Sequence, residues 1–103
     1  MKKLILTAFF VSSFAHANWD DPMRVFDARD NTKTQVNVIW KAVADVQKTC
    51  EAESRKRGNK GFGYAVNACT FWEGNTCTII TKYQVNMHTL GHETLHCFRG
   101  NWH

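Results

Sequence analysis

Four cysteines in a chain of 103 residues constrain the fold more than any other feature of this sequence. A domain of this size buries only a modest apolar core, and small secreted domains compensate with covalent crosslinks. The cysteines form no C-x-x-C pair, which disfavours a zinc ribbon and a thioredoxin-like redox centre. The sequence therefore predicts two structural disulfides within a single small domain.

The segment 1–17 has the pattern of a secretory signal peptide. Two lysines provide the positive start, an apolar run covers 4–14, and Ala-His-Ala forms a small-x-small cleavage site. The apolar run is shorter than the roughly 20 residues that span a bilayer, which disfavours an uncleaved membrane anchor. We therefore expect a mature chain, 18–103, that is periplasmic or secreted by a bacterium and is not bound to a membrane.

The charge balance argues against nucleic acid as a partner. The whole chain holds 13 basic and 9 acidic residues, for a formal net charge of +4. Loss of the two lysines in the signal segment lowers the net charge of the mature chain to about +2, which is too mild for nucleic-acid binding. We expect the mature chain to be a monomer.

Hydrophobic periodicity in the first half predicts one long helix. This helix is expected over most of 41–57, where alanine, lysine, glutamine and glutamate are frequent, and Gly58 ends it. The residues just before it, 36–40, fit either a strand or the first turns of the same helix. Three glycines within 58–63 then predict a loop.

The second half predicts an antiparallel β-hairpin. The β-rich runs 68–72 and 76–81 flank the turn sequence Glu-Gly-Asn. Alternation would place Cys77, Ile79 and Thr81 on one face of the second strand, with Thr78 and Ile80 on the other face. With the helix, this hairpin or small sheet indicates an α+β domain.

A second helix is expected at about 86–98. Its first residue, an asparagine, is a suitable N-cap, and Gly100 stands where a glycine in the left-handed conformation ends a helix. At about 100° per residue, His88 and His96 lie within about 40° of His92, and apolar side chains lie on the opposite side. The helix is therefore expected to present imidazoles on the face turned away from the core.

Three pairings of the four cysteines are open on sequence alone. We favour Cys50 with Cys69 and Cys77 with Cys97, because the second bridge would clamp the C-terminal helix to a neighbouring strand. A bridge between Cys69 and Cys77, which leaves Cys50 to pair with Cys97, is the alternative.

Two histidines of the C-terminal helix have the spacing of zinc ligands. His92 and His96 project from successive turns in the same direction and can bind one ion at about 2.0 to 2.1 Å. Glu93 is rotated away from the ion by one residue and suits a general base that takes a proton from zinc-activated water. His103 is the expected third ligand if the chain breaks at Gly100, because a continuous helix would carry it about 10 Å beyond His96.

The segment 92–96, His-Glu-Thr-Leu-His preceded by glycine, resembles the active-site helix of the zincin metallopeptidases, in which both histidines bind zinc and the glutamate is the general base. Gly100 and His103 resemble the metzincin extension, although six residues separate the second and third histidines here, where metzincins have five. The ending is also similar to that of short secreted bacterial proteins that carry Gly-His-Glu-x-x-His-Cys and a final Gly-x-x-His.

This resemblance implies a minimal zincin-like domain over 18–103 that hydrolyses peptide bonds in a peptide or protein substrate. An edge strand above the cleft would then pair with the extended substrate, and Thr76 to Thr81 is the candidate. Two alternatives are open, a zinc-binding protein without catalysis and a disulfide-stapled interaction module of the cell envelope. His88 has no assigned role in any of them.

Overall fold

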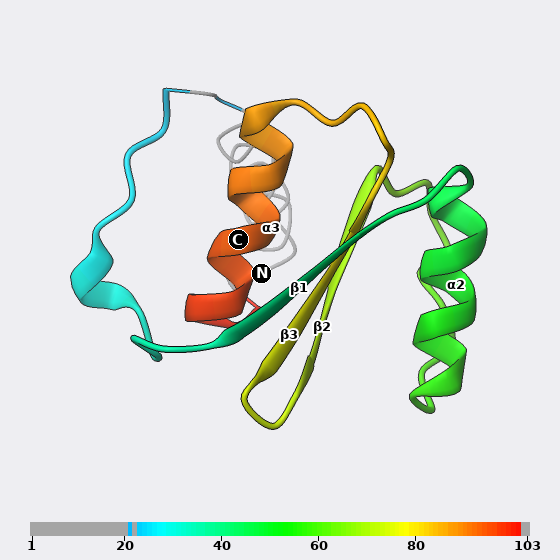
Figure 1. The fold of residues 1–103 in the computed structure, drawn as a ribbon, viewed down its shortest axis with the longest axis horizontal. Coiled ribbons are helices and arrows are strands. Elements are labelled where there is room, and N and C mark those ends of the chain that lie inside the picture. The colour runs from blue at the N-terminus through cyan, green and yellow to red at the C-terminus, as the bar shows by residue number, and fades with distance from the viewer. Residues whose placement is uncertain (1–20, 22, 102–103) are drawn as a thin grey trace, which may run out of the picture.

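The computed structural model describes residue 21 and residues 23–101, so the expected signal peptide and His103 lie outside the described residues. In this part the chain forms an α+β domain with a mixed three-stranded sheet (Figure 1). No helix in it combines the length and the apolar character needed to cross a membrane. The elements in chain order are η1 (Ala28–Asp30), β1 (Asn37–Ala42), α2 (Val46–Lys56), β2 (Ala68–Glu73), β3 (Thr76–Thr81) and α3 (Met87–Arg99).

The predicted hairpin is confirmed, and β1 adds a third strand to it. β2 and β3 pair antiparallel, and β1 pairs parallel to β3, which gives the strand order β1-β3-β2. The expectation that Thr76 to Thr81 forms an edge strand was therefore wrong, since β3 is hydrogen-bonded on both sides. β3 is the most buried strand, with Ile79 and Ile80 each 1% exposed, and a central position shields it best.

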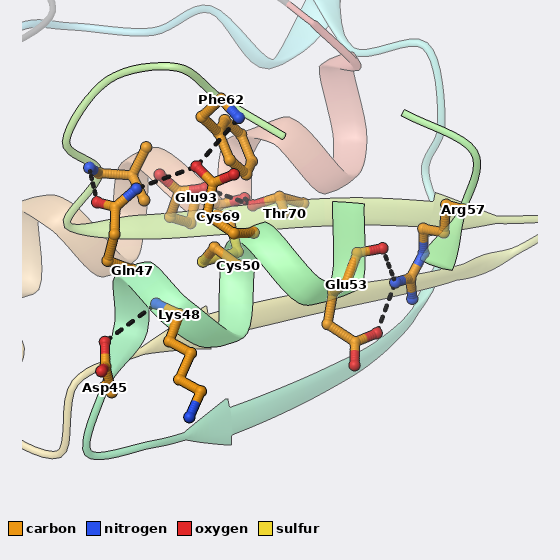
Figure 2. Close-up of a disulfide and its surroundings, with 12 residues drawn as sticks. Asp45, Gln47, Lys48, Cys50, Glu53, Arg57, Phe62, Cys69, Thr70 and Glu93 are labelled. Atoms are coloured by element: carbon orange, nitrogen blue, oxygen red, sulfur yellow. Dashed lines mark hydrogen bonds and ion pairs between the residues drawn. A yellow bond between two sulfur atoms is a disulfide. The ribbon is translucent and has the colours of Figure 1, made fainter. Parts of the chain in front are cut away.

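The first predicted helix is confirmed over most of 41–57, but it starts later than the first residue of that range. Lys41 and Ala42 belong to β1, and α2 begins only at Val46. Asp45 sets this boundary because its carboxylate accepts a hydrogen bond from the backbone N–H of Lys48 at 3.0 Å (Figure 2). Of the two interpretations of 36–40, the strand is thus confirmed.

The two α-helices cover opposite faces of the sheet (Figure 1). On one face, Ile80 packs with Val46 and Cys50 of α2, together with Cys69 and Phe71 of β2. On the other face, Cys77 and Ile79 pack with Cys97 of α3. The period-2 alternation expected for β3 therefore divides the small core into two halves, each held by one helix.

The favoured disulfide pairing is confirmed. Cys50 of α2 is bonded to Cys69 of β2, and Cys77 of β3 is bonded to Cys97 of α3. Each half of the core therefore contains one covalent link between a helix and the sheet. Disulfides of this kind persist in oxidising compartments, which indicates an extracytoplasmic location.

Candidate metal centre

Helix α3 begins and ends where its sequence predicts. The Asn86 side chain accepts a hydrogen bond from the backbone N–H of Thr89 at 2.7 Å, which satisfies one of the otherwise unbonded amides of the first turn. At the other end Gly100 has a φ of 78°, and its N–H donates to the carbonyl oxygen of His96 at 2.9 Å. A glycine adopts this conformation without a steric penalty, so the helix ends at Arg99 with Gly100 as its C-cap.

The segment 30–33, which precedes β1, holds the last turn of α3. Backbone N–H groups of Thr32 and Lys33 donate to the carbonyl oxygen of Phe98 at 2.8 and 3.1 Å. The guanidinium of Arg99 lies 3.6 Å from the Asp30 carboxylate. Carbonyls at a helix end lack partners within the helix, so these contacts stabilise the turn that carries the second histidine of the motif.

His92, Glu93 and His96 form a buried cluster on α3, with exposed fractions of 7%, 8% and 6%. Each residue offers one potential metal-ligand atom, and these three atoms lie within 4.8 Å of one another. The two histidine Nε2 atoms are 3.3 Å apart. Two zinc ligands at about 2.0 to 2.1 Å in tetrahedral geometry are separated by about 3.3 to 3.4 Å, so this pair fits a zinc ion.

The ring of His96 is oriented for metal binding by a backbone group. Its Nδ1 lies 2.7 Å from the carbonyl oxygen of Gly100, which can only accept a hydrogen bond. Nδ1 therefore carries the proton, and Nε2 keeps its lone pair toward His92. Burial lowers the pKa of His96, with the Gly100 contact opposing that effect, and the neutral ring that results is the form that binds a metal.

The Glu93 carboxylate is held by a residue of the neighbouring strand. The Thr70 hydroxyl donates a hydrogen bond to Glu93 Oε1 at 2.5 Å (Figure 2). Burial raises the pKa of Glu93, and the Thr70 hydrogen bond opposes the rise. A carboxylate with a raised pKa accepts and returns protons more readily near neutral pH than an exposed carboxylate does.

β2 also fixes the position of the helical turn that carries His96. The indole N–H of Trp72 donates to the carbonyl oxygen of His96 at 2.8 Å, and the two rings meet edge to face with centroids 6.2 Å apart. The next residue, Cys97, is tied to β3 by its disulfide. Two strands therefore restrain the segment that carries His96.

The cluster lies in a cleft of about 760 Å³ between α3, β2 and the loop that precedes β2. The three cluster residues and His88 line the side formed by α3. Residues 68–72 of β2 and most of the residues of 59–67 line the rest of the cleft. This cleft is large enough to take a segment of peptide.

The structure thus brings together three of the four predicted site residues, while His103 lies outside the described part of the chain. Sequence reasoning missed Thr70 and Trp72. Alternation along β2 places both on one face of the strand, but nothing in the sequence indicates that this face meets α3.

Comparison with protein-family models, curated proteins and solved structures found no match for this chain. The resemblance to zincins therefore depends on the H-E-x-x-H motif and on the buried cluster that it forms.

Proposed function

We propose that this chain is a secreted or periplasmic zinc-dependent peptidase in which His92, His96 and His103 bind the metal and Glu93 is the general base. One observation carries the proposal. The two histidine Nε2 atoms converge at a zinc-compatible distance of 3.3 Å beside a buried carboxylate, on the wall of a peptide-sized cleft.

Residues in the cluster and beside it have separate roles in the proposed reaction. Zinc, when bound, acts as a Lewis acid and lowers the pKa of water to about 7. The Glu93 carboxylate then accepts a proton from the attacking water and returns it to the leaving nitrogen. Thr70 holds the carboxylate in place, and the Gly100 carbonyl keeps the His96 ring turned toward His92.

We propose that the substrate binds as an extended strand along β2 instead of β3. β2 pairs with β3 on one side only. In the described part of the chain, its backbone groups make no hydrogen bond outside that ladder. An edge strand of this kind accepts an added strand through main-chain hydrogen bonds, and β2 borders the cleft that contains the metal centre.

A metal measurement tests the first part of the proposal. The purified protein should contain one zinc per chain, and His92→Ala should lower the zinc content well below that value. Elemental analysis of both proteins after dialysis gives the answer. Substoichiometric zinc in wild type and variant alike would exclude a zinc enzyme and favour the interaction module.

Glu93→Gln tests the catalytic role. If Glu93 is the general base, the variant should keep its zinc and lose hydrolysis of an unstructured protein such as casein by about 10²- to 10⁴-fold. The second candidate is a non-catalytic zinc protein, favoured by the proximity of the Glu93 carboxylate to the histidine nitrogens, within 4.8 Å. In that case Glu93→Gln should weaken zinc binding, and neither protein should cleave casein.

A further inference from the structure

We infer that 61–66, named here the apolar wall, is a subsite that selects bulky hydrophobic side chains of an extended polypeptide. The inference rests on the proposed function in one respect, because it places the polypeptide in the same cleft, along β2. It adds the class of substrate, namely a segment with apolar residues at alternate positions.

The apolar wall consists of the sequence Gly-Phe-Gly-Tyr-Ala-Val and holds no charged side chain. All of its residues except Gly63 line the cleft that contains the His92–Glu93–His96 cluster, and the wall and the cluster contact opposite faces of β2. Tyr64 is 67% exposed, and its ring meets that of Phe62 edge to face at 5.9 Å. Exposed aromatic side chains that line a cleft are typical of binding sites.

Helix α2 holds the backbone of the apolar wall in place (Figure 2). Gln47, Glu51 and Ser54 are spaced four and three residues apart, so they lie on one face of α2. Their side chains accept hydrogen bonds from three backbone N–H groups of the wall, those of Val66 at 2.8 Å, Phe62 at 3.1 Å and Gly61 at 3.2 Å. A subsite that is rigid before binding loses little conformational entropy when a ligand arrives.

The glycine at the start of the wall is required for this arrangement. Gly61 has a φ of 86°, and a Cβ at this position would lie 2.0 Å from Oε1 of Glu51. The positive φ therefore favours glycine, and a larger residue would also displace the Glu51 carboxylate that holds Phe62. The backbone of this loop is therefore held in one conformation by the side chains of α2.

Strand geometry determines which substrate side chains meet the wall. Side chains of an added strand alternate between the two faces of the sheet. Thr70 of β2 contacts Glu93 on the α3 face. Phe62 and Val66 pack against the core cluster that contains Cys69 and Phe71, on the α2 face. A strand along β2 would therefore turn one set of side chains toward the metal centre and the alternate set toward the apolar wall.

The test uses binding, so that it does not depend on hydrolysis. The probes are fluorescein-labelled decapeptides of serine, threonine and glycine that differ at one central position, which is phenylalanine, leucine or aspartate. They are titrated into the zinc-loaded full chain carrying Glu93→Gln, and fluorescence anisotropy gives the dissociation constants. The phenylalanine and leucine peptides should bind about tenfold more tightly than the aspartate peptide, since an uncharged wall leaves a carboxylate without a partner.

Tyr64 and Tyr83 provide a matched pair of variants, because they are the two tyrosines of the chain and are 67% and 71% exposed. Tyr64→Ala should reduce the preference for phenylalanine over aspartate to about threefold or less. Tyr83→Ala, outside the cleft, should leave the preference unchanged. Both replaced side chains are exposed, so both variants are expected to fold, and circular dichroism checks this.

Equal affinity for all three peptides would overturn the inference, as would a preference that Tyr64→Ala leaves intact. The proposed function is tested separately by casein cleavage with the wild-type protein. Selective binding without cleavage would support the apolar wall and refute the peptidase. Cleavage without selectivity would refute the apolar wall alone.

Discussion

The two disulfides join different helices to the sheet, but the chain loops that they close are nearly equal in length. Their sequence separations are 19 residues for Cys50–Cys69 and 20 residues for Cys77–Cys97. Loop-closure entropy of the unfolded chain then gives each bridge a contribution of about 3 kcal/mol. Replacing either pair of cysteines with alanine should therefore lower the free energy of unfolding by about the same amount.

Zinc affinity should distinguish the two variants. Cys97 follows His96 directly, and its bridge to β3 restrains the turn of α3 that carries this candidate ligand. Cys50–Cys69 joins α2 to β2 on the other face of the sheet, and neither cysteine lies on the helix that carries His92, Glu93 and His96. Replacing Cys77 and Cys97 should lower zinc affinity about tenfold, the size of effect typical of residues that orient metal ligands, and replacing the other pair should leave it unchanged.

Two measurements check this prediction. Urea unfolding of both double variants without metal gives the loss of stability, and competition with a chromophoric chelator gives zinc affinity. The competition is run at low temperature, where circular dichroism confirms that both variants are folded. If both variants lose zinc affinity to the same extent, the effect follows global stability and the argument for a local restraint on α3 is refuted.

Two further predictions concern Glu93 and Thr70. Thr70→Val removes the hydroxyl that holds the Glu93 carboxylate, so kcat for casein should fall about tenfold while zinc content is unchanged, and Thr70→Ser should restore most of the activity. An equal loss in both variants would contradict a positioning role. Burial raises the pKa of Glu93 above its ordinary value of 4.5, so ionisation lowers the stability of the folded metal-free protein as pH rises through that range. In urea unfolding, metal-free Glu93→Gln should therefore gain stability relative to wild type between pH 4 and pH 7, and a constant difference would refute the argument.

Much of the candidate site could be predicted from local sequence. The i, i+4 spacing of His92 and His96 is enough to bring their rings together, because it follows from helix geometry alone. The cap at Asn86 and the stop at Gly100 are likewise local, since each depends on hydrogen bonds within about one turn of the helix. These features appear in the structure as predicted.

The boundary between β1 and α2 could not be placed from the sequence in the same way. Val36, Ile39 and Val43 recur at helical spacing, but 36–40 also alternate like a strand. Pairing with β3 decided between the two, because it satisfies the backbone groups of Asn37–Ala42 through a partner that lies in the second half of the chain.

By itself, then, the sequence determined the C-terminal helix with its candidate metal ligands, the hairpin and the number of crosslinks, because each depends on residue type and spacing along a short segment. Tertiary structure alone decided that β2, and not β3, borders the cluster. It also supplied Thr70 and Trp72 as the partners of Glu93 and His96, at sequence separations of 23 and 24 residues. The physical reason is that these contacts follow from the parallel pairing of β1 with β3, which places β3 at the centre of the sheet and leaves β2 at its edge beside the cleft.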